Sequence, residues 1–210
     1  MKNNKLNKIS TILFYGAIWG ILEASLGYVL HFVPTFIAGT IMFPIVSVLL
    51  VRAYAKTNSK ASLVFIGLVA SFIKGINLFM PQYSIWKTIN PMISIVVESI
   101  LVLAVIQIIS KDKPLQTFVA LPLVSIGWRV LFLANLGIQF LANGYLATQI
   151  SGIYPAFEFV ILSGIVSGVI GVSLLVINSL WNKKIKLSVS IKPVLSFITF
   201  ALAIVITILL

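Results

Sequence analysis

The stretch PAFEFVILSGIVSGVIGVSLLVINSLW, residues 155–181, decides the fold, because Glu158 is the one charged side chain in it. A helix needs about 20 apolar residues to cross a bilayer. Runs of similar character cover 10–32, 36–55, 61–80, 88–109 and 115–136, and a shorter one covers 194–210. The composition agrees, with 60% hydrophobic and 9% charged residues. We therefore predict an all-α, polytopic membrane helix bundle with six spans and a seventh helix at 194–210.

A β-barrel is excluded, because its strands alternate polar and apolar residues over about ten positions, whereas the runs in this chain are longer and apolar throughout. We expect one integral membrane domain over residues 1–210, made of a basic segment at 1–9, a six-helix bundle at 10–181 and the additional helix at 194–210. That last stretch is short, so it could span, lie at an edge or re-enter. The first apolar run is too long for a signal peptide and contains Glu23, which indicates a retained span.

The basic residues mark one face of the membrane. Twelve of the fifteen lysines and arginines lie at the amino end or follow the second, fourth and sixth spans: Lys2, Lys5, Lys8, Arg52, Lys56, Lys60, Lys111, Lys113, Lys183, Lys184, Lys186 and Lys192. The opposite loops carry only Lys87. The positive-inside rule places the basic side, with the amino terminus, in the cytoplasm, as in a plasma or bacterial inner membrane. The net charge of +11 is dispersed over short loops, so we expect no nucleic-acid partner.

Five ionisable side chains interrupt the spans: Glu23, Lys74, Glu98, Arg129 and Glu158. Such residues are costly in lipid unless they pair or face water, so they usually mark a function. Counted at about 1.5 Å per residue from the expected span ends, all five lie in the outer half of the membrane. We predict an outward-facing substrate-binding pocket, with His31, Asn77 and Glu158 nearer its mouth.

One stripe of the first span combines small and ionisable residues: Gly16, Gly20, Glu23, Gly27 and His31. Their spacing places them within an arc of about 80° on a helix. Small residues at this spacing let another helix approach closely. We interpret the inner half of the stripe as a docking face for a helix and the outer half as lining of the site. Plain helix packing around a satisfied Glu23 is the alternative.

A short internal repeat relates LVASFIK at 68–74 to LVSIGWR at 123–129. Each segment ends in a base and is followed by a loop, a proline and a glutamate, which favours two related hairpins such as transporters contain. The same residues permit an architectural alternative. In it Lys74 pairs with Glu98, and Arg129 with Glu158, only to hold helices together.

Enzymatic motifs are missing from the sequence. His31 is the only histidine and cysteine does not occur, so a zinc site lacks ligands. The sequence contains no HExxH, GxSxG, P-loop or GxGxxG pattern. We therefore predict a protein that is not an enzyme, with no catalytic residues, no metal site and no cofactor.

The segment GAIWGILEA at 16–24, six spans with basic inner loops and an outward polar site give the chain a resemblance to a known family. Over residues 10–181 it resembles the substrate-binding S components of energy-coupling factor transporters. Those proteins bind vitamins or metal ions from outside and dock, through small residues of the first helix, on a transmembrane subunit coupled to two ATPases. The resemblance implies such partners here, with Gly16, Gly20 and Ala24 as the coupling face. The helix at 194–210 departs from the family's six helices.

Taken together, the sequence favours a membrane protein that binds a small polar solute as the substrate-specific component of an uptake transporter. Acids and bases side by side suit a zwitterion, or a ring with hydrogen-bond donors and acceptors. Two alternatives stay open: an autonomous proton-coupled secondary transporter, and a non-catalytic membrane assembly subunit.

Overall fold

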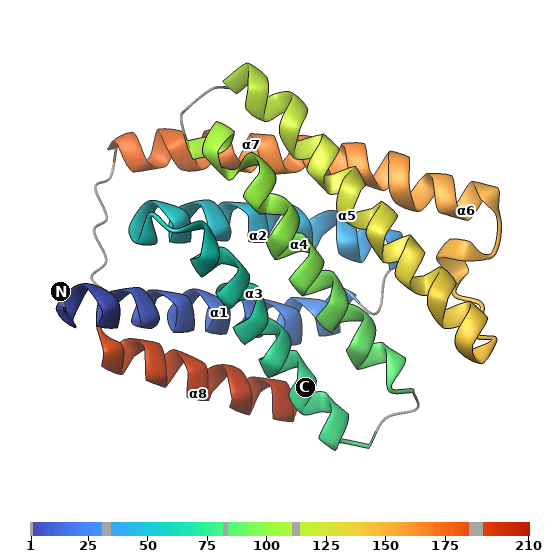
Figure 1. The fold of residues 1–210 in the computed structure, drawn as a ribbon, viewed down its shortest axis with the longest axis horizontal. Helices are drawn as coiled ribbons and strands as arrows, with labels where there is room; N and C mark the ends of the chain where they lie inside the picture. The colour runs from blue at the N-terminus through green and yellow to red at the C-terminus, as the bar shows by residue number, and fades with distance from the viewer. Residues whose placement is uncertain (1, 31–34, 82–83, 111–113, 185–190) are drawn as a thin grey trace.

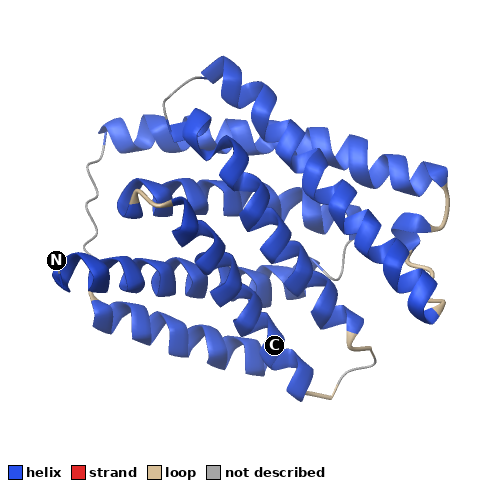
Figure 2. Cartoon of the chain, viewed as in Figure 1, coloured by secondary structure: helices blue, strands red, loops and turns tan. Residues whose placement is uncertain are grey.

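The structure is a computed structural model that describes residues 2–30, 35–81, 84–110, 114–184 and 191–210. The α-helices are α1 (Lys2–Leu30), α2 (Thr35–Thr57), α3 (Lys60–Gly75), α4 (Trp86–Ser110), α5 (Pro114–Asn143), α6 (Ile153–Phe157), α7 (Ser163–Lys184) and α8 (Pro193–Leu209). Two 3₁₀ turns, Ile76–Phe79 and Thr148–Ile150, follow α3 and precede α6, and a π-helical turn, Glu158–Leu162, joins α6 to α7. The described residues contain no strand (Figure 2).

Six segments are long and apolar enough to cross a membrane: Lys5–Val29, Gly39–Thr57, Lys60–Phe79, Trp86–Ile106, Leu115–Asn143 and Ile153–Leu180. They correspond to the six predicted spans and confirm an all-α, polytopic helix bundle. Large apolar side chains cover its outside, including Phe72, Leu123 and Phe197, which are each more than 60% exposed. Such a surface suits lipid and not water. The chain is a multi-pass membrane protein.

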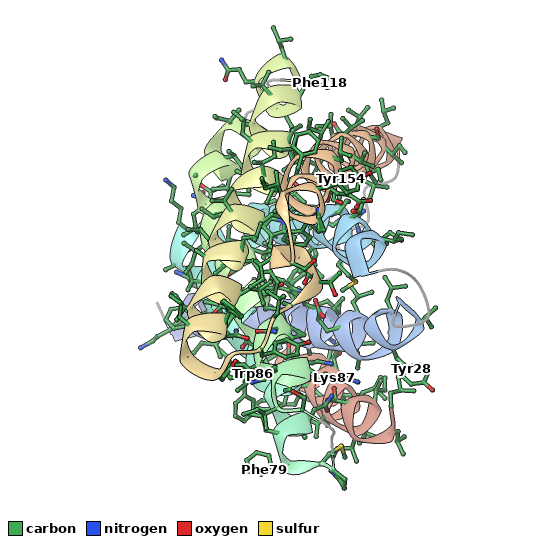
Figure 3. All side chains as sticks on the ribbon, turned by 90° about the vertical axis from the view of Figure 1, so that its right-hand side faces the viewer. Tyr28, Phe79, Trp86, Lys87, Phe118 and Tyr154 are labelled. Atoms are coloured by element: carbon green, nitrogen blue, oxygen red, sulfur yellow. The ribbon has the colours of Figure 1, made fainter. Side chains whose placement is uncertain are left out.

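The helices form two layers (Figures 1 and 3). One layer contains α8, α1, α2 and α7 side by side, and the other contains α3, α4 and α5, which cross the first layer obliquely. Helix α3 packs on α1, and α5 packs on α7. Consecutive spans run in opposite directions (Figure 1). The segments rich in lysine and arginine lie at the end of the bundle where α1 begins. We call this the basic end, and its counterpart the opposite end.

Helix α8 lies along α1 and runs in the same direction. Ser196, near the start of α8, donates a hydrogen bond of 2.8 Å to the backbone carbonyl of Ser10. Two turns further along, Ala203 is packed with Ala17 in a small buried cluster. The contact points advance equally on both helices, so α8 rises beside α1 from the basic end. Its 17 residues cover about 25 Å, somewhat less than the hydrocarbon core.

Helix α5 continues past residue 136, where the sequence predicted its end, to Asn143. Gln139, Leu141 and Ala142 in this stretch are good helix formers, and one glycine lowers helix propensity by only about 1 kcal/mol. The helix ends where Gly144 adopts a φ of 71°. The Gly144 N–H then caps the Phe140 carbonyl at 2.8 Å, a common helix ending.

Aromatic residues surround the opposite end, which faces the viewer in Figure 3. Tyr28, Phe79, Trp86 and Tyr154 lie on this side, with Lys87 next to Trp86, and Phe79 is 91% exposed. Aromatic side chains at this level are typical of the membrane–water interface. The rim therefore marks where the bundle leaves the hydrocarbon core.

Candidate functional site

Arg129 lies at the centre of the bundle and is fully buried. Its Nη1 donates to the Ser125 carbonyl (2.9 Å) and to Ser125 Oγ (2.6 Å), and its Nη2 donates to the Gly39 carbonyl on α2 (3.1 Å). The guanidinium also covers the Trp128 ring, with Cζ 4.5 Å from the ring centroid. Its Nε has no hydrogen-bond partner. The cation is thus held in place by α2 and α5 with donor capacity left over.

Glu98 of α4 is the acidic side chain that interacts electrostatically with Arg129. It is 5% exposed and accepts a hydrogen bond of 3.3 Å from Ser94, one turn away on the same helix. It lies within electrostatic range of Arg129 and also of Glu23 on α1. One acid therefore faces a base and a second acid across helix boundaries.

Glu23 and Lys74 extend this arrangement to α1 and α3. Glu23 accepts a hydrogen bond of 3.2 Å from the Trp19 indole N–H, one turn earlier. It lies within electrostatic range of Lys74. Both side chains are partly exposed, unlike Glu98 and Arg129. Together these residues form what we call the four-charge cluster: Lys74, Glu23, Glu98 and Arg129, from four different helices.

The cluster is not a set of closed ion pairs. Among its four side chains, all described, no nitrogen lies within 4.0 Å of a carboxylate oxygen. The electrostatic neighbours also differ from the architectural pairing considered above. Lys74 lies near Glu23, and Arg129 lies near Glu98. Charged groups held in this way keep some hydrogen-bonding atoms unpaired, whereas buried polar groups are normally paired.

The two halves of the glycine stripe of α1 have different surroundings. A Cβ on Gly16 would lie 2.6 Å from Val69, and one on Gly20 would lie 2.8 Å from Ile73, so this half docks closely on α3. A Cβ on Gly27 would meet only Glu23 Oε2, at 4.0 Å. Helices α1 and α3 therefore separate beyond Gly20, and space opens beside the Glu23 carboxylate.

The same contacts describe the surroundings of the three residues predicted as the coupling face, a role that stays a prediction. Gly16, Gly20 and Ala24 are all buried inside this chain. The close approach that small residues permit is used by α3, because α3 follows two short connections later and must cover the apolar side of α1. These three residues do not present an open surface to a second subunit.

The remaining predicted residues are Asn77, Glu158 and His31. Asn77 lies in the 3₁₀ turn directly after α3, and its Oδ1 is buried without a hydrogen-bond partner. Glu158 begins the π-helical turn and is partly exposed. It is not among the electrostatic neighbours of Arg129. His31 lies outside the described residues.

Three amide side chains that were not predicted from the sequence lie between the four-charge cluster and the opposite end. We call them the amide track: Asn90, Asn135 and Gln139. Gln139 of α5 is 5% exposed and donates to Asn90 Oδ1 of α4 at 2.6 Å. Gln139 Oε1 and Asn135 Nδ2 are buried without partners. The spacing of Asn90, Ser94 and Glu98 by four residues, one face of α4, could have revealed this track.

Two surface grooves of the bundle lie elsewhere. One, of about 480 Å³, is lined by apolar residues of α1, α3 and α8, including Ile12, Phe72 and Phe200. The other, of about 320 Å³, lies between α2 and α7 and includes Arg52 and Asn178. Neither groove is lined by a predicted substrate-binding residue. Within the four-charge cluster, Glu98 and Arg129 are buried, and Glu23 and Lys74 form its partly exposed edge.

Comparisons with protein-family models, with curated proteins and with solved structures found no match to this chain. The class of the protein therefore follows from its own architecture: a multi-pass helical membrane protein with charged side chains in its interior.

Proposed function

We propose that this membrane protein binds a small polar solute at the four-charge cluster and serves as the substrate-specific component of an uptake transporter. One observation carries the proposal: two acids and two bases from four helices come together inside the bundle without direct ion pairs. Moving each charged side chain out of water costs roughly several kcal/mol, the usual desolvation penalty of a buried ion. A ligand with complementary charges would recover much of that cost.

Unused hydrogen-bonding atoms support the same proposal. Arg129 Nε lies in the cluster, and Asn135 Nδ2 and Gln139 Oε1 follow along the track toward the opposite end. Buried polar atoms are nearly always paired in proteins, so unpaired ones invite a ligand or water. They are two donors and one acceptor, which suits a zwitterion or a polar ring better than a simple ion.

Entry from the opposite end is favoured by exposure and space. Glu23 and Lys74 form the exposed edge of the cluster, and Gly27 leaves room beside Glu23. The Asn90–Gln139 pair lies two turns from Glu98 along α4. We propose that the solute passes these groups, and that a transmembrane coupling subunit with ATPases drives its release on the other side.

Native mass spectrometry of the gently purified protein tests this proposal. We expect a retained small molecule, together with an ATPase and a second membrane subunit. Glu98→Gln should abolish retention while the protein stays folded, because glutamine keeps an oxygen that can accept from Ser94. The matched control is Glu158→Gln, which removes the same charge outside the cluster. A folded wild-type chain without a solute would contradict the proposal.

An autonomous proton-coupled carrier is the second candidate, and the neighbouring acids Glu23 and Glu98 favour it. Two nearby carboxylates hold one proton readily, because like charges disfavour each other's ionised forms. Purified protein in sealed vesicles would distinguish the two. Uptake of the retained solute driven by a pH gradient alone, and lost in Glu98→Gln, would establish the carrier. Uptake that needs the ATPases would exclude it.

A further inference from the structure

We propose that the groove between α2 and α7 binds one anionic phospholipid of the leaflet at the basic end. Its acyl chain would lie along the apolar walls of the groove, and Arg52 would hold the phosphate. This site is separate from the four-charge cluster and does not depend on the solute proposed above.

The groove lies between two packed helices. Gly171 of α7 meets Leu121 and, at 3.7 Å from its would-be Cβ, the Cα of Pro44 on α2. The groove itself is lined by Ile45, Val48, Arg52, Leu174, Ile177 and Asn178. Its apolar members advance by three or four residues on each helix, so they form two facing walls. From Ile45 to Arg52 the groove extends about 10 Å along α2.

A polar pair closes this groove on the side of the basic end. Arg52 Nε donates to Asn178 Oδ1 at 2.6 Å, which links α2 to α7. This bond fixes the plane of the guanidinium and uses one of its five N–H donors. Arg52 is exposed, so its two terminal nitrogens can serve a ligand. Guanidinium groups bind phosphate through paired hydrogen bonds.

Charge complementarity selects an anionic lipid as the occupant. Lys56, one turn after Arg52 on α2, is exposed near the same end, and the sequence places twelve basic residues there against one acid, Asp112. Basic pockets between transmembrane helices on this side bind anionic headgroups. The apolar walls match the chain of a lipid and would not retain a free phosphate. Ile177, at 56% exposure, opens the groove to the bilayer.

Native mass spectrometry from an equimolar mixture of phosphatidylglycerol and phosphatidylcholine with identical acyl chains tests the site. We expect wild type to retain one phosphatidylglycerol. Arg52→Gln should lower this retention more than about tenfold, as loss of a hydrogen bond to a charged group does. The matched control, Lys60→Gln, removes the same charge at the same end but outside the groove and should retain the lipid.

A second pair of variants tests the same site if Arg52→Gln does not fold. Asn178→Asp keeps the oxygen that accepts from Arg52 while adding a negative charge beside the phosphate, so retention should fall. Its control, Ser59→Asp, adds the same charge at the amino-terminal cap of α3, where aspartate is favoured. Equal retention of both lipids by wild type would overturn the proposal. Equal losses in Arg52→Gln and Lys60→Gln would also overturn it, since they would indicate diffuse attraction only.

Discussion

Arg129 Nη2 on α5 donates a hydrogen bond of 3.1 Å to the backbone carbonyl of Gly39 on α2, ninety residues earlier in the chain. A Cβ on Gly39 would lie 3.5 Å from the Trp128 ring and 3.9 Å from Arg129 Nη2. These are ordinary van der Waals distances, so the hydrogen bond does not depend on the absence of a side chain at Gly39. The central cation is anchored by two backbone carbonyls and the Ser125 hydroxyl and not by a carboxylate.

The electrostatic relation between Arg129 and Glu98 can be measured by a double-mutant cycle. We expect Arg129→Met and Glu98→Gln to be coupled by about 1 kcal/mol or more in the free energy of unfolding, within the range seen for interacting residues. The physical reason is that each single change leaves the opposite charge buried without compensation. Denaturation in mixed micelles provides the measurement.

The control cycle combines Arg129→Met with Glu158→Gln. Glu158 is not an electrostatic neighbour of Arg129, so these two effects should add. Coupling in the control cycle but not in the first would restore the Arg129–Glu158 pairing that the internal repeat suggested.

The contact between α5 and α7 depends on a glycine stripe, Gly164, Gly168 and Gly171, spaced by four and three residues. A Cβ on Gly168 would clash with backbone atoms of Pro122. We expect Gly168→Ala to lower the free energy of unfolding by about 1–3 kcal/mol, the usual cost of overpacking. Gly137→Ala is the control, because nothing lies within 4 Å of its would-be Cβ. That change should be neutral or stabilising, and equal losses in both would show that α5 and α7 do not pack as described.

The fold could be predicted almost completely from the sequence, because bilayer thickness converts apolar run length into helix length directly. The ends of helices were less accessible: Gly137 did not stop α5, since packing and neighbouring helix formers outweigh one glycine. In the site, rarity in lipid identified Glu23, Lys74, Glu98 and Arg129. Their mutual arrangement was not predictable, because it depends on which helices become neighbours.

The predicted coupling face and the amide track illustrate two things that could not be predicted from the sequence. A small-residue stripe says that something approaches closely, but not whether it belongs to the same chain, and α3 takes that place on Gly16 and Gly20. Asn90, Asn135 and Gln139 were missed because uncharged amides are common near membrane boundaries. They gain meaning only when α4 and α5 bring them together.

The position of Gly16 in an intramolecular contact gives a prediction that separates it from a coupling role. We expect Gly16→Ala to destabilise the purified chain without any partner, because the new methyl group would lie 2.6 Å from Val69. The cost should be about 1–3 kcal/mol. Gly27→Ala, on the same stripe, meets only a side-chain oxygen at 4.0 Å and should be tolerated. A Gly16→Ala chain that unfolds like wild type would return this face to the list of coupling surfaces.

The direction of α8 predicts on which side of the membrane residue 210 lies. Since α8 runs parallel to α1 from the basic end, residue 210 should lie across the membrane from the amino terminus. The chain has no cysteine, so single cysteines can report sidedness without background. In intact cells an impermeant maleimide should label Leu210→Cys, whereas Ser59→Cys, in the basic loop between α2 and α3, should react only after permeabilisation. Labelling of both positions from the same side would mean that α8 does not cross, and that its contact with α1 forms within one leaflet.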